Sequence, residues 1–101
     1  MYQFSKIRFE QFKILKAEKK FKDAMVMLVS SYVVNAYGIQ GMYFNKEKFK
    51  KDAKTTAKGV GISETDLSSF ADRLEKDIKA KKIKEATVQK YCVDWFSKQG
   101  V

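Results

Sequence analysis

Residues 24–38 read AMVMLVSSYVVNAYG and carry no charged side chain. They are apolar on nearly every side, which is the pattern of the most buried helix in a small bundle. Four valines lower the helix propensity of this stretch, so a strand is the alternative. The apolar part runs for only about 11 residues, well short of the roughly 20 that a membrane span needs. We therefore predict a buried central helix that begins after Asp23 as N-cap and ends at Gly38 as C-terminal cap.

The composition of the whole chain agrees with a helical fold. There is no proline and there are only 5 glycines in 101 residues, which favours long, uninterrupted helices. With 45% hydrophobic and 14% aromatic residues, the chain can bury a modest core. We predict an all-α fold, a small single-domain bundle of four to five helices over residues 1–101. Its N-terminal part, 1–58, is basic, and its C-terminal helical hairpin, 59–101, is nearly neutral.

Two helices are expected after the central one, beyond a connection anchored by Tyr43 and Phe44. Asn45 is a good N-cap for a helix over 46–59. Ser63 begins the next helix, with an acid three residues later that suits the helix dipole. The apolar residues of this second helix follow i, i+3, i+4, i+7 and i+11 spacing: Leu67, Phe70, Ala71, Leu74 and Ile78.

The last helix is predicted over residues 85–98 and is closed by Gly100. Its apolar residues recur at helical spacing and include Cys92 and Trp95. Free cysteine is among the most buried residue types, so we expect Cys92 in the core and not as a reactive thiol.

The N-terminal segment, residues 2–22, is dense in aromatic residues and lysines. We predict a helix whose apolar face combines Phe4, Ile7, Phe12 and Leu15. The first eight of these residues also alternate between apolar and polar, so a short strand or an extended arm is the alternative there.

The chain lacks the residues that several kinds of catalytic and metal-binding site require. There is no histidine, so imidazole cannot act as a base or a metal ligand. One cysteine cannot form an internal disulfide, and no cluster has zinc-ligand spacing. Neither a nucleophile elbow nor a phosphate-cradling glycine-rich loop is found. We expect a protein that is not an enzyme and uses no metal or cofactor. The single thiol favours a reducing, cytoplasmic location.

Positive charge is concentrated in the first part of the chain. The formal net charge is +9. Residues 1–58 hold 13 lysines and arginines against 5 acids, whereas residues 59–101 hold 8 against 7. Such an asymmetry indicates a polyanionic partner: nucleic acid, an acidic protein or an anionic membrane.

Residues 53–72, AKTTAKGVGISETDLSSFAD, contain a recognisable pattern. A small residue in a first helix, Ala57, is followed four residues later by Gly61 at a turn, with apolar residues at Val60, Ile62, Leu67 and Phe70. This segment resembles the helix-turn-helix of phage Cro and repressor proteins. The small residue lets two helices cross closely and glycine takes the turn.

The resemblance implies a second helix that faces the DNA major groove. The residues it would present are Ser63, Glu64, Thr65, Ser68, Ser69 and Asp72. Residues 59–72 carry a net charge of −3, and acids are repelled by phosphates, so a purely structural helical corner is the alternative.

From these features we predict a small basic nucleic-acid-binding protein with a regulatory or accessory role, and duplex DNA is the favoured partner. The basic residues are nearly all lysines, which suits phosphate contact better than base reading. The candidate binding residues are Lys6, Arg8, Lys13, Lys16, Lys46, Lys50, Lys51, Lys54, Lys58, Thr65 and Ser68.

Other partners remain open at the level of the sequence. A protein-binding adaptor or inhibitor would dock the same lysines on an acidic partner surface. Three tyrosines, Tyr32, Tyr37 and Tyr43, would suit a homodimer or partner interface. A basic, aromatic N-terminal helix would suit an anionic membrane surface, which we rank last, so we expect no membrane partner.

Overall fold

The computed structural model describes residues 3–38 and 44–101, so the predicted anchor Tyr43 lies outside it. The described residues form helices and no strand, which confirms the predicted all-α bundle. The elements are α1 (Gln3–Ala17), α2 (Phe21–Gly38), α3 (Lys46–Val60), α4 (Glu64–Lys79), the 3-10 turn η1 (Glu85–Thr87) and α5 (Val88–Lys98).

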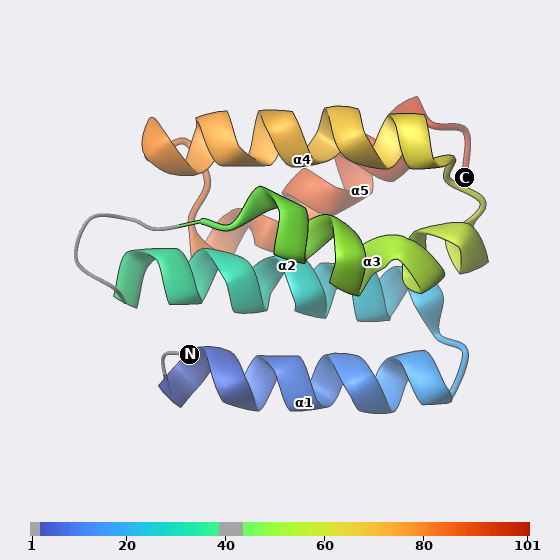
Figure 1. Cartoon of the computed structure of the whole chain (residues 1–101), viewed down its shortest axis with the longest axis horizontal. Coiled ribbons are helices and arrows are strands. Elements are labelled where there is room, and N and C mark those ends of the chain that lie inside the picture. Colours follow the sequence, from blue (N-terminus) through green and yellow to red (C-terminus); the bar gives the residue numbers. More distant parts are fainter. Residues whose placement is uncertain (1–2, 39–43) are drawn as a thin grey trace.

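Helix α2 is the centre of the bundle, as predicted. It contacts α1, α3 and α5, and Figure 1 shows it between α1 below and α4 above, with α3 in front and α5 behind. Ten of its residues are buried, among them Met25, Leu28 and Val33. The alternative of a strand is therefore wrong.

Residues 3–9, for which a strand or arm was the alternative, are helical, because α1 begins at Gln3. It ends earlier than predicted, at Ala17, and α2 begins at Phe21. Asp23 is therefore not an N-cap but lies in the first turn of α2, where an acid still suits the helix dipole.

The inner face of α1 differs from the predicted apolar face. Ser5 is fully buried, and its carbonyl accepts a 3.0 Å hydrogen bond from the Ser31 hydroxyl of α2. Phe12 is buried as expected, but Phe4 and Ile7 are more than half exposed. The reason is that α2 presents polar side chains at this contact: Ser31 binds the Ser5 carbonyl, and the Ser5 hydroxyl donates to the Asn35 side-chain oxygen at 3.3 Å.

Four helix ends close with a residue in the left-handed region: Lys19, Gly61, Lys81 and Gly100. At each, the amide that follows donates to a carbonyl five residues earlier, for example Lys82 to Asp77 at 2.8 Å and Ile62 to Ala57 at 2.9 Å. This is the Schellman arrangement, in which glycine is preferred because a Cβ is strained at positive φ.

Lys81→Gly is expected to raise the free energy of unfolding by about 1 kcal/mol, because it removes this strain at φ 58°. The matched control is Lys82→Gly, an exposed neighbour outside the left-handed region, which should lower stability through chain entropy. Urea unfolding of both variants measures the effect. Equal shifts in the same direction would contradict the strain argument.

The C-terminal helices pack through aromatic rings. Phe70 of α4 stacks on Trp95 of α5 with ring centroids 3.7 Å apart. Cys92 of α5 is also buried, and this burial raises the pKa of its thiol to about 12. The predicted core position of Cys92 is therefore confirmed, and its burial disfavours the thiolate, which is the reactive form.

Candidate nucleic-acid interface

Helix α3 begins at the N-cap that its sequence predicts. The Asn45 side chain accepts a hydrogen bond from the Lys48 amide at 3.0 Å, which confirms the N-cap. Phe49, Ala53 and Ala57 are buried along one side of the helix. These small and apolar residues occupy the side of α3 that faces the core. The six lysines of α3 therefore lie on the outer side of the helix or along its edges.

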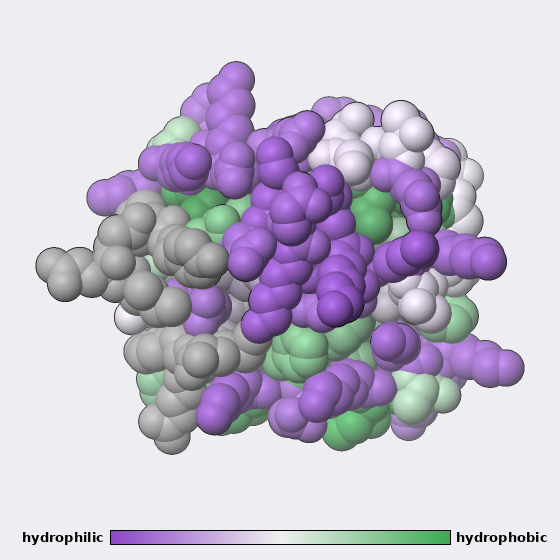
Figure 2. Space-filling view, viewed as in Figure 1, coloured by the Kyte–Doolittle hydropathy of each residue, from purple (hydrophilic) through white to green (hydrophobic). Residues whose placement is uncertain are grey.

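The lysines of α3 gather on one side of the molecule. Lys48, Lys51, Lys54 and Lys58 are exposed, and Lys46 and Lys50 are half-buried along the edge that faces α4. Figure 2 shows this side, with hydrophilic side chains over the middle, where α3 lies in Figure 1. Six lysines against Glu47 and Asp52 give α3 a net charge of +4.

Two lysines of α1 extend this surface. A groove of about 490 Å³ between α1 and α3 has Lys6 on one wall and Lys48 and Asp52 on the other. Lys13 lies over the Phe9 ring beside this groove and pairs with Glu10 at 3.2 Å. We call the exposed lysines on these two helices the lysine face: Lys6, Lys13, Lys48, Lys51, Lys54 and Lys58.

Three lysines of α3 are ion-paired. Lys46 binds Asp72 at 2.8 Å, Lys54 binds Glu64 at 3.3 Å, and Lys50 binds Glu47 within the helix at 3.0 Å. The hydrogen bond and charge of Lys46 lower the pKa of Asp72, and Asp72 raises the pKa of Lys46 in turn. Exposed pairs of this kind are weak and salt-sensitive, so a phosphate can compete for these ammonium groups.

Three other lysines of α3 are unpaired. Within residues 3–38 and 44–101, Lys48, Lys51 and Lys58 form no ion pair. All three are exposed. They are therefore the ammonium groups most available to an external anion.

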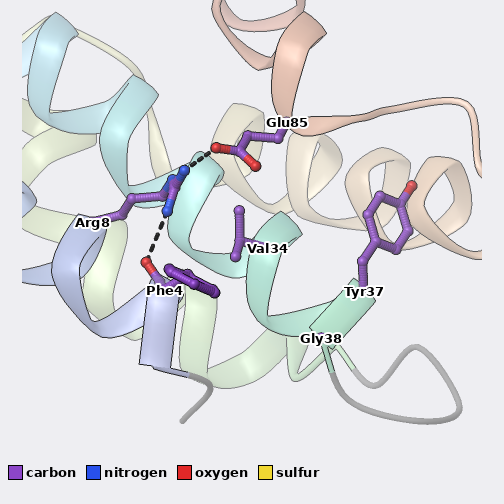
Figure 3. Close-up of a pocket in the computed structure, with 6 residues that line it drawn as sticks. All are labelled: Phe4, Arg8, Val34, Tyr37, Gly38 and Glu85. Atoms are coloured by element: carbon purple, nitrogen blue, oxygen red, sulfur yellow. Dashed lines mark hydrogen bonds and ion pairs between the residues drawn. The ribbon is translucent and has the colours of Figure 1, made fainter.

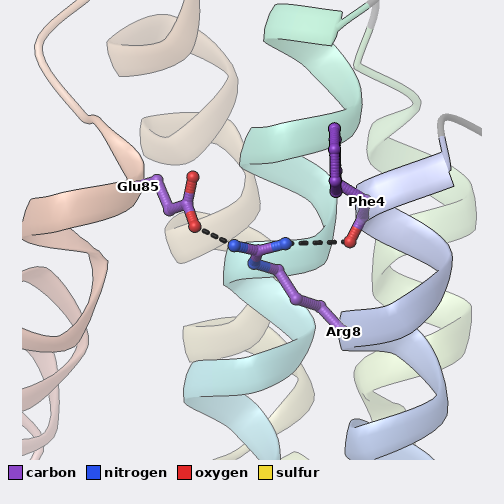
Figure 4. Close-up of polar contacts among 3 residues, drawn as sticks. All are labelled: Phe4, Arg8 and Glu85. Atoms are coloured by element: carbon purple, nitrogen blue, oxygen red, sulfur yellow. Dashed lines mark hydrogen bonds and ion pairs between the residues drawn. The ribbon is translucent and has the colours of Figure 1, made fainter.

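Two predicted binding residues lie away from the lysine face. Arg8 lines a cavity of about 440 Å³ on another side of α1, beside Val34 and Tyr37 (Figure 3). Its guanidinium binds the Glu85 carboxylate and the Phe4 carbonyl, as Figure 4 shows. Lys16 is half-buried, with its ammonium 5.7 Å from the Phe12 ring centroid. Both cations already have partners inside the fold.

The corner between α3 and α4 contains the residues of the helix-turn-helix resemblance. Gly61 adopts φ 98°, and Ser63 caps α4 by accepting from the Asp66 amide at 3.1 Å. Four of the apolar or small residues of the pattern are buried: Ala57, Ile62, Leu67 and Phe70. Docking of α4 on DNA stays a prediction.

The other residues predicted for DNA contact lie around the groove between α3 and α4. Ser68 lines this groove, whose volume is about 340 Å³, together with Lys50 and Lys54. Thr65 is exposed in the first turns of α4. Glu64 and Asp72 are bound to α3 lysines, so their charges are partly neutralised there.

Two partly buried hydrogen bonds between tyrosine and aspartate were not predicted. The Tyr32 hydroxyl donates to Asp52 at 2.5 Å, and the Tyr91 hydroxyl donates to Asp77 at 2.6 Å. Burial, with the adjacent carboxylate, raises the pKa of each tyrosine. Tyr32 is only 5% exposed, so its predicted place in a dimer or partner interface is wrong. Nothing in the sequence indicates either pair, because the partners are 20 and 14 positions apart in the chain.

Comparisons of this chain with protein-family models, with curated proteins and with solved structures find no match. In the part of the chain that the structure describes, no group of three or more acidic or cysteine side chains is placed to hold a metal ion. No helix among the described residues is both long and apolar enough to cross a membrane.

Proposed function

We propose that this protein binds nucleic acid by phosphate contacts from the lysine face, independently of base sequence. The observation that carries the proposal is the set of unpaired, exposed lysines on α3, namely Lys48, Lys51 and Lys58, with Lys6 across the adjoining groove. Ammonium groups bind phosphates as point charges and release the counterions condensed on the polyanion.

The spacing of the lysines supports contact with an extended polyanion. Lys46, Lys50, Lys54 and Lys58 recur every four residues along α3. Four residues advance a helix by about 6 Å, so the row spans roughly 18 Å from end to end. Helices α1 and α3 also run in the same direction (Figure 1), and Lys6 of α1 lies across a groove from Lys48 of α3. A phosphate backbone lying along α3 would meet charge over the whole length of the helix.

The chemistry of the face favours phosphates over bases. Neither arginine of the chain belongs to it, since Arg8 is bound to Glu85 and Arg73 lies beside Asp77 on α4 at 3.6 Å. Arginine is the residue that reads guanine with a two-pronged hydrogen bond, and lysine mainly recognises charge. The proposed binding is therefore similar for duplexes of unrelated sequence.

The experiment replaces the three unpaired lysines, Lys48, Lys51 and Lys58, with glutamine. The plot of log K against log salt for duplex DNA should become less steep by about 2.7, because three phosphate contacts are lost. At about 0.1 M salt the affinity should fall by roughly 10²–10³-fold. Fluorescence anisotropy with a labelled duplex measures both quantities.

The control variant carries the same change of charge elsewhere. Three exposed lysines serve for this control: Lys79 at the end of α4, Lys82 in the segment that follows it, and Lys90 on α5. None of them is ion-paired among the described residues. Replacing all three with glutamine should leave the salt slope nearly unchanged. If both triple variants lose affinity equally, the net charge alone attracts the nucleic acid and the lysine face is not the site. An acidic protein surface would then be the next partner to test.

A further inference from the structure

The groove between α1 and α3 combines apolar and charged side chains. Its volume is about 490 Å³, within the range of about 300–1,000 Å³ that small-ligand sites occupy. Figure 2 shows hydrophobic side chains between the hydrophilic ones of α3, in the middle, and those along α1, below. The residues that line the groove are Lys6, Ile7, Phe9, Glu10, Lys48 and Asp52.

Phe9 is an aromatic ring at the surface of this groove. Its side chain is half-buried, and it packs against the buried Phe12 with ring centroids 5.3 Å apart. The Lys13 ammonium lies over the ring, 5.4 Å from its centroid. The ring is thus held by the core and is open to a mobile side chain on one face. A flat ring system can stack on such a face, and every nucleobase has one.

The charges of the groove favour an anionic ligand. Glu10 is paired with Lys13 at 3.2 Å, and Asp52 accepts a 2.5 Å hydrogen bond from a tyrosine of α2, so both acids are bound within the fold. Lys6 and Lys48 are exposed and form no ion pair within residues 3–38 and 44–101. An unpaired ammonium group on each side of the groove attracts phosphates to both of its edges.

The other side of α3 is less open to a strand. There Lys46 pairs with Asp72 and Lys54 pairs with Glu64. Carboxylates of α4 thus occupy the ammonium groups that phosphates would bind along this edge. A polyanion that follows α3 meets unpaired ammonium groups on the side of α1 instead.

We infer that the α1–α3 groove holds an unpaired base of single-stranded nucleic acid, stacked on Phe9, while Lys6 and Lys48 bind phosphates on either side of it. This inference rests on the proposed function, because it names the form of nucleic acid that the lysine face prefers. A base in a duplex is paired and stacked, and its extrusion costs more than in a single strand. Stacking on an aromatic ring tolerates every base, so the binding stays independent of sequence.

Fluorescence anisotropy of the whole chain tests the inference, with a labelled single strand of about 12 nucleotides and with the duplex of the same sequence. At equal salt the wild type should bind the strand about 5–100-fold more tightly than the duplex. A DNA strand and an RNA strand should both show this preference, because stacking and phosphate contacts do not involve the sugar.

Phe9→Leu removes the ring and keeps an apolar side chain. It should lower the affinity for the single strand by about 5–100-fold and leave the affinity for the duplex unchanged. The matched control is Phe4→Leu, which removes a ring of the same helix that is 53% exposed and lines the separate cavity of Figure 3. This control should bind both ligands like the wild type. Circular dichroism should show an unchanged fold for both variants.

Phe9→Trp provides a direct readout of stacking. It keeps an aromatic face, so it should retain the preference for the single strand. Its fluorescence should be quenched when the strand binds, because a base would cover the indole. The native Trp95 is only 5% exposed and should contribute little to this change.

The inference fails if the wild type binds the duplex as tightly as the strand, or if Phe9→Leu and Phe4→Leu lose strand affinity equally. Duplex binding with the expected salt slope would then leave the proposed function standing, whereas binding of neither ligand would overturn both. Polyglutamate carries negative charge without rings. If it binds the wild type and Phe9→Leu abolishes that binding, the groove belongs to an acidic protein partner instead.

Discussion

Phe49→Ala is expected to lower the free energy of unfolding by about 3–5 kcal/mol. Phe49 is fully buried, and its ring lies 5.2 Å from Tyr32, 5.8 Å from Phe44 and 6.2 Å from Phe70, measured between centroids. It thus joins α2, α3 and α4 at one point. Truncation would remove buried apolar area, break three ring contacts and leave a cavity that rigid helices cannot close.

A loss of this size is a large part of the 5–15 kcal/mol that stabilises a typical domain. Urea unfolding followed by circular dichroism measures it. Phe49→Leu is the control, because it keeps most of the volume and should cost much less. A cost below about 1 kcal/mol for Phe49→Ala would contradict the position of this ring at the centre of the core.

Gly59→Ala is expected to lower the free energy of unfolding by about 1–3 kcal/mol, although alanine is the better helix former. Gly59 lies in the last turn of α3, where a Cβ would come within 2.5–2.7 Å of three atoms of the Phe21 ring. Such distances require the ring, at the start of α2, to move.

Two comparisons isolate the clash. Thr55→Ala, one turn earlier on the exposed side of α3, should be neutral or stabilising. In a Phe21→Ala background, where the ring is gone, Gly59→Ala should no longer destabilise, so the two changes should not be additive. Thermal or urea unfolding of the four variants completes the cycle. Stabilisation by Gly59→Ala in the wild type would show that the contact is absent.

Much of the fold was predictable because local signals and burial agree. An uncharged apolar run forms α2, Asn45 and Ser63 cap helices, and Gly61 and Gly100 end them. At these positions the helix end or the burial is determined by one residue or its nearest neighbours in the chain. That is the information a single sequence contains most directly.

The errors in the fold have tertiary causes. Lys19 and Lys81 end helices in the conformation that glycine prefers, so the sequence shows no stop signal at either place. Ser5 is buried only because α2 offers hydrogen-bonding partners there, which turns Ile7 outward. The need for glycine at position 59 arises from a ring 38 residues away in the chain.

The candidate site was partly predictable for the same reason. The lysines of α3 were identified from the charge distribution, and helix periodicity explains why they lie away from the buried Phe49, Ala53 and Ala57. The sequence could not show that Arg8, unlike the nearby lysines, is bound within the fold, because its partner Glu85 is 77 residues away. Nor could the sequence show which α3 lysines are paired, since Asp72 and Glu64 come from another helix.

The most direct test of the proposed function is the salt dependence of duplex DNA binding by the wild-type chain. We expect a straight line of log K against log salt with a slope of about −4 to −5, which corresponds to about five lysine–phosphate contacts. The slope should be the same for duplexes of unrelated sequence. No binding at about 0.05 M salt, or a slope near zero, would contradict a phosphate-binding lysine face.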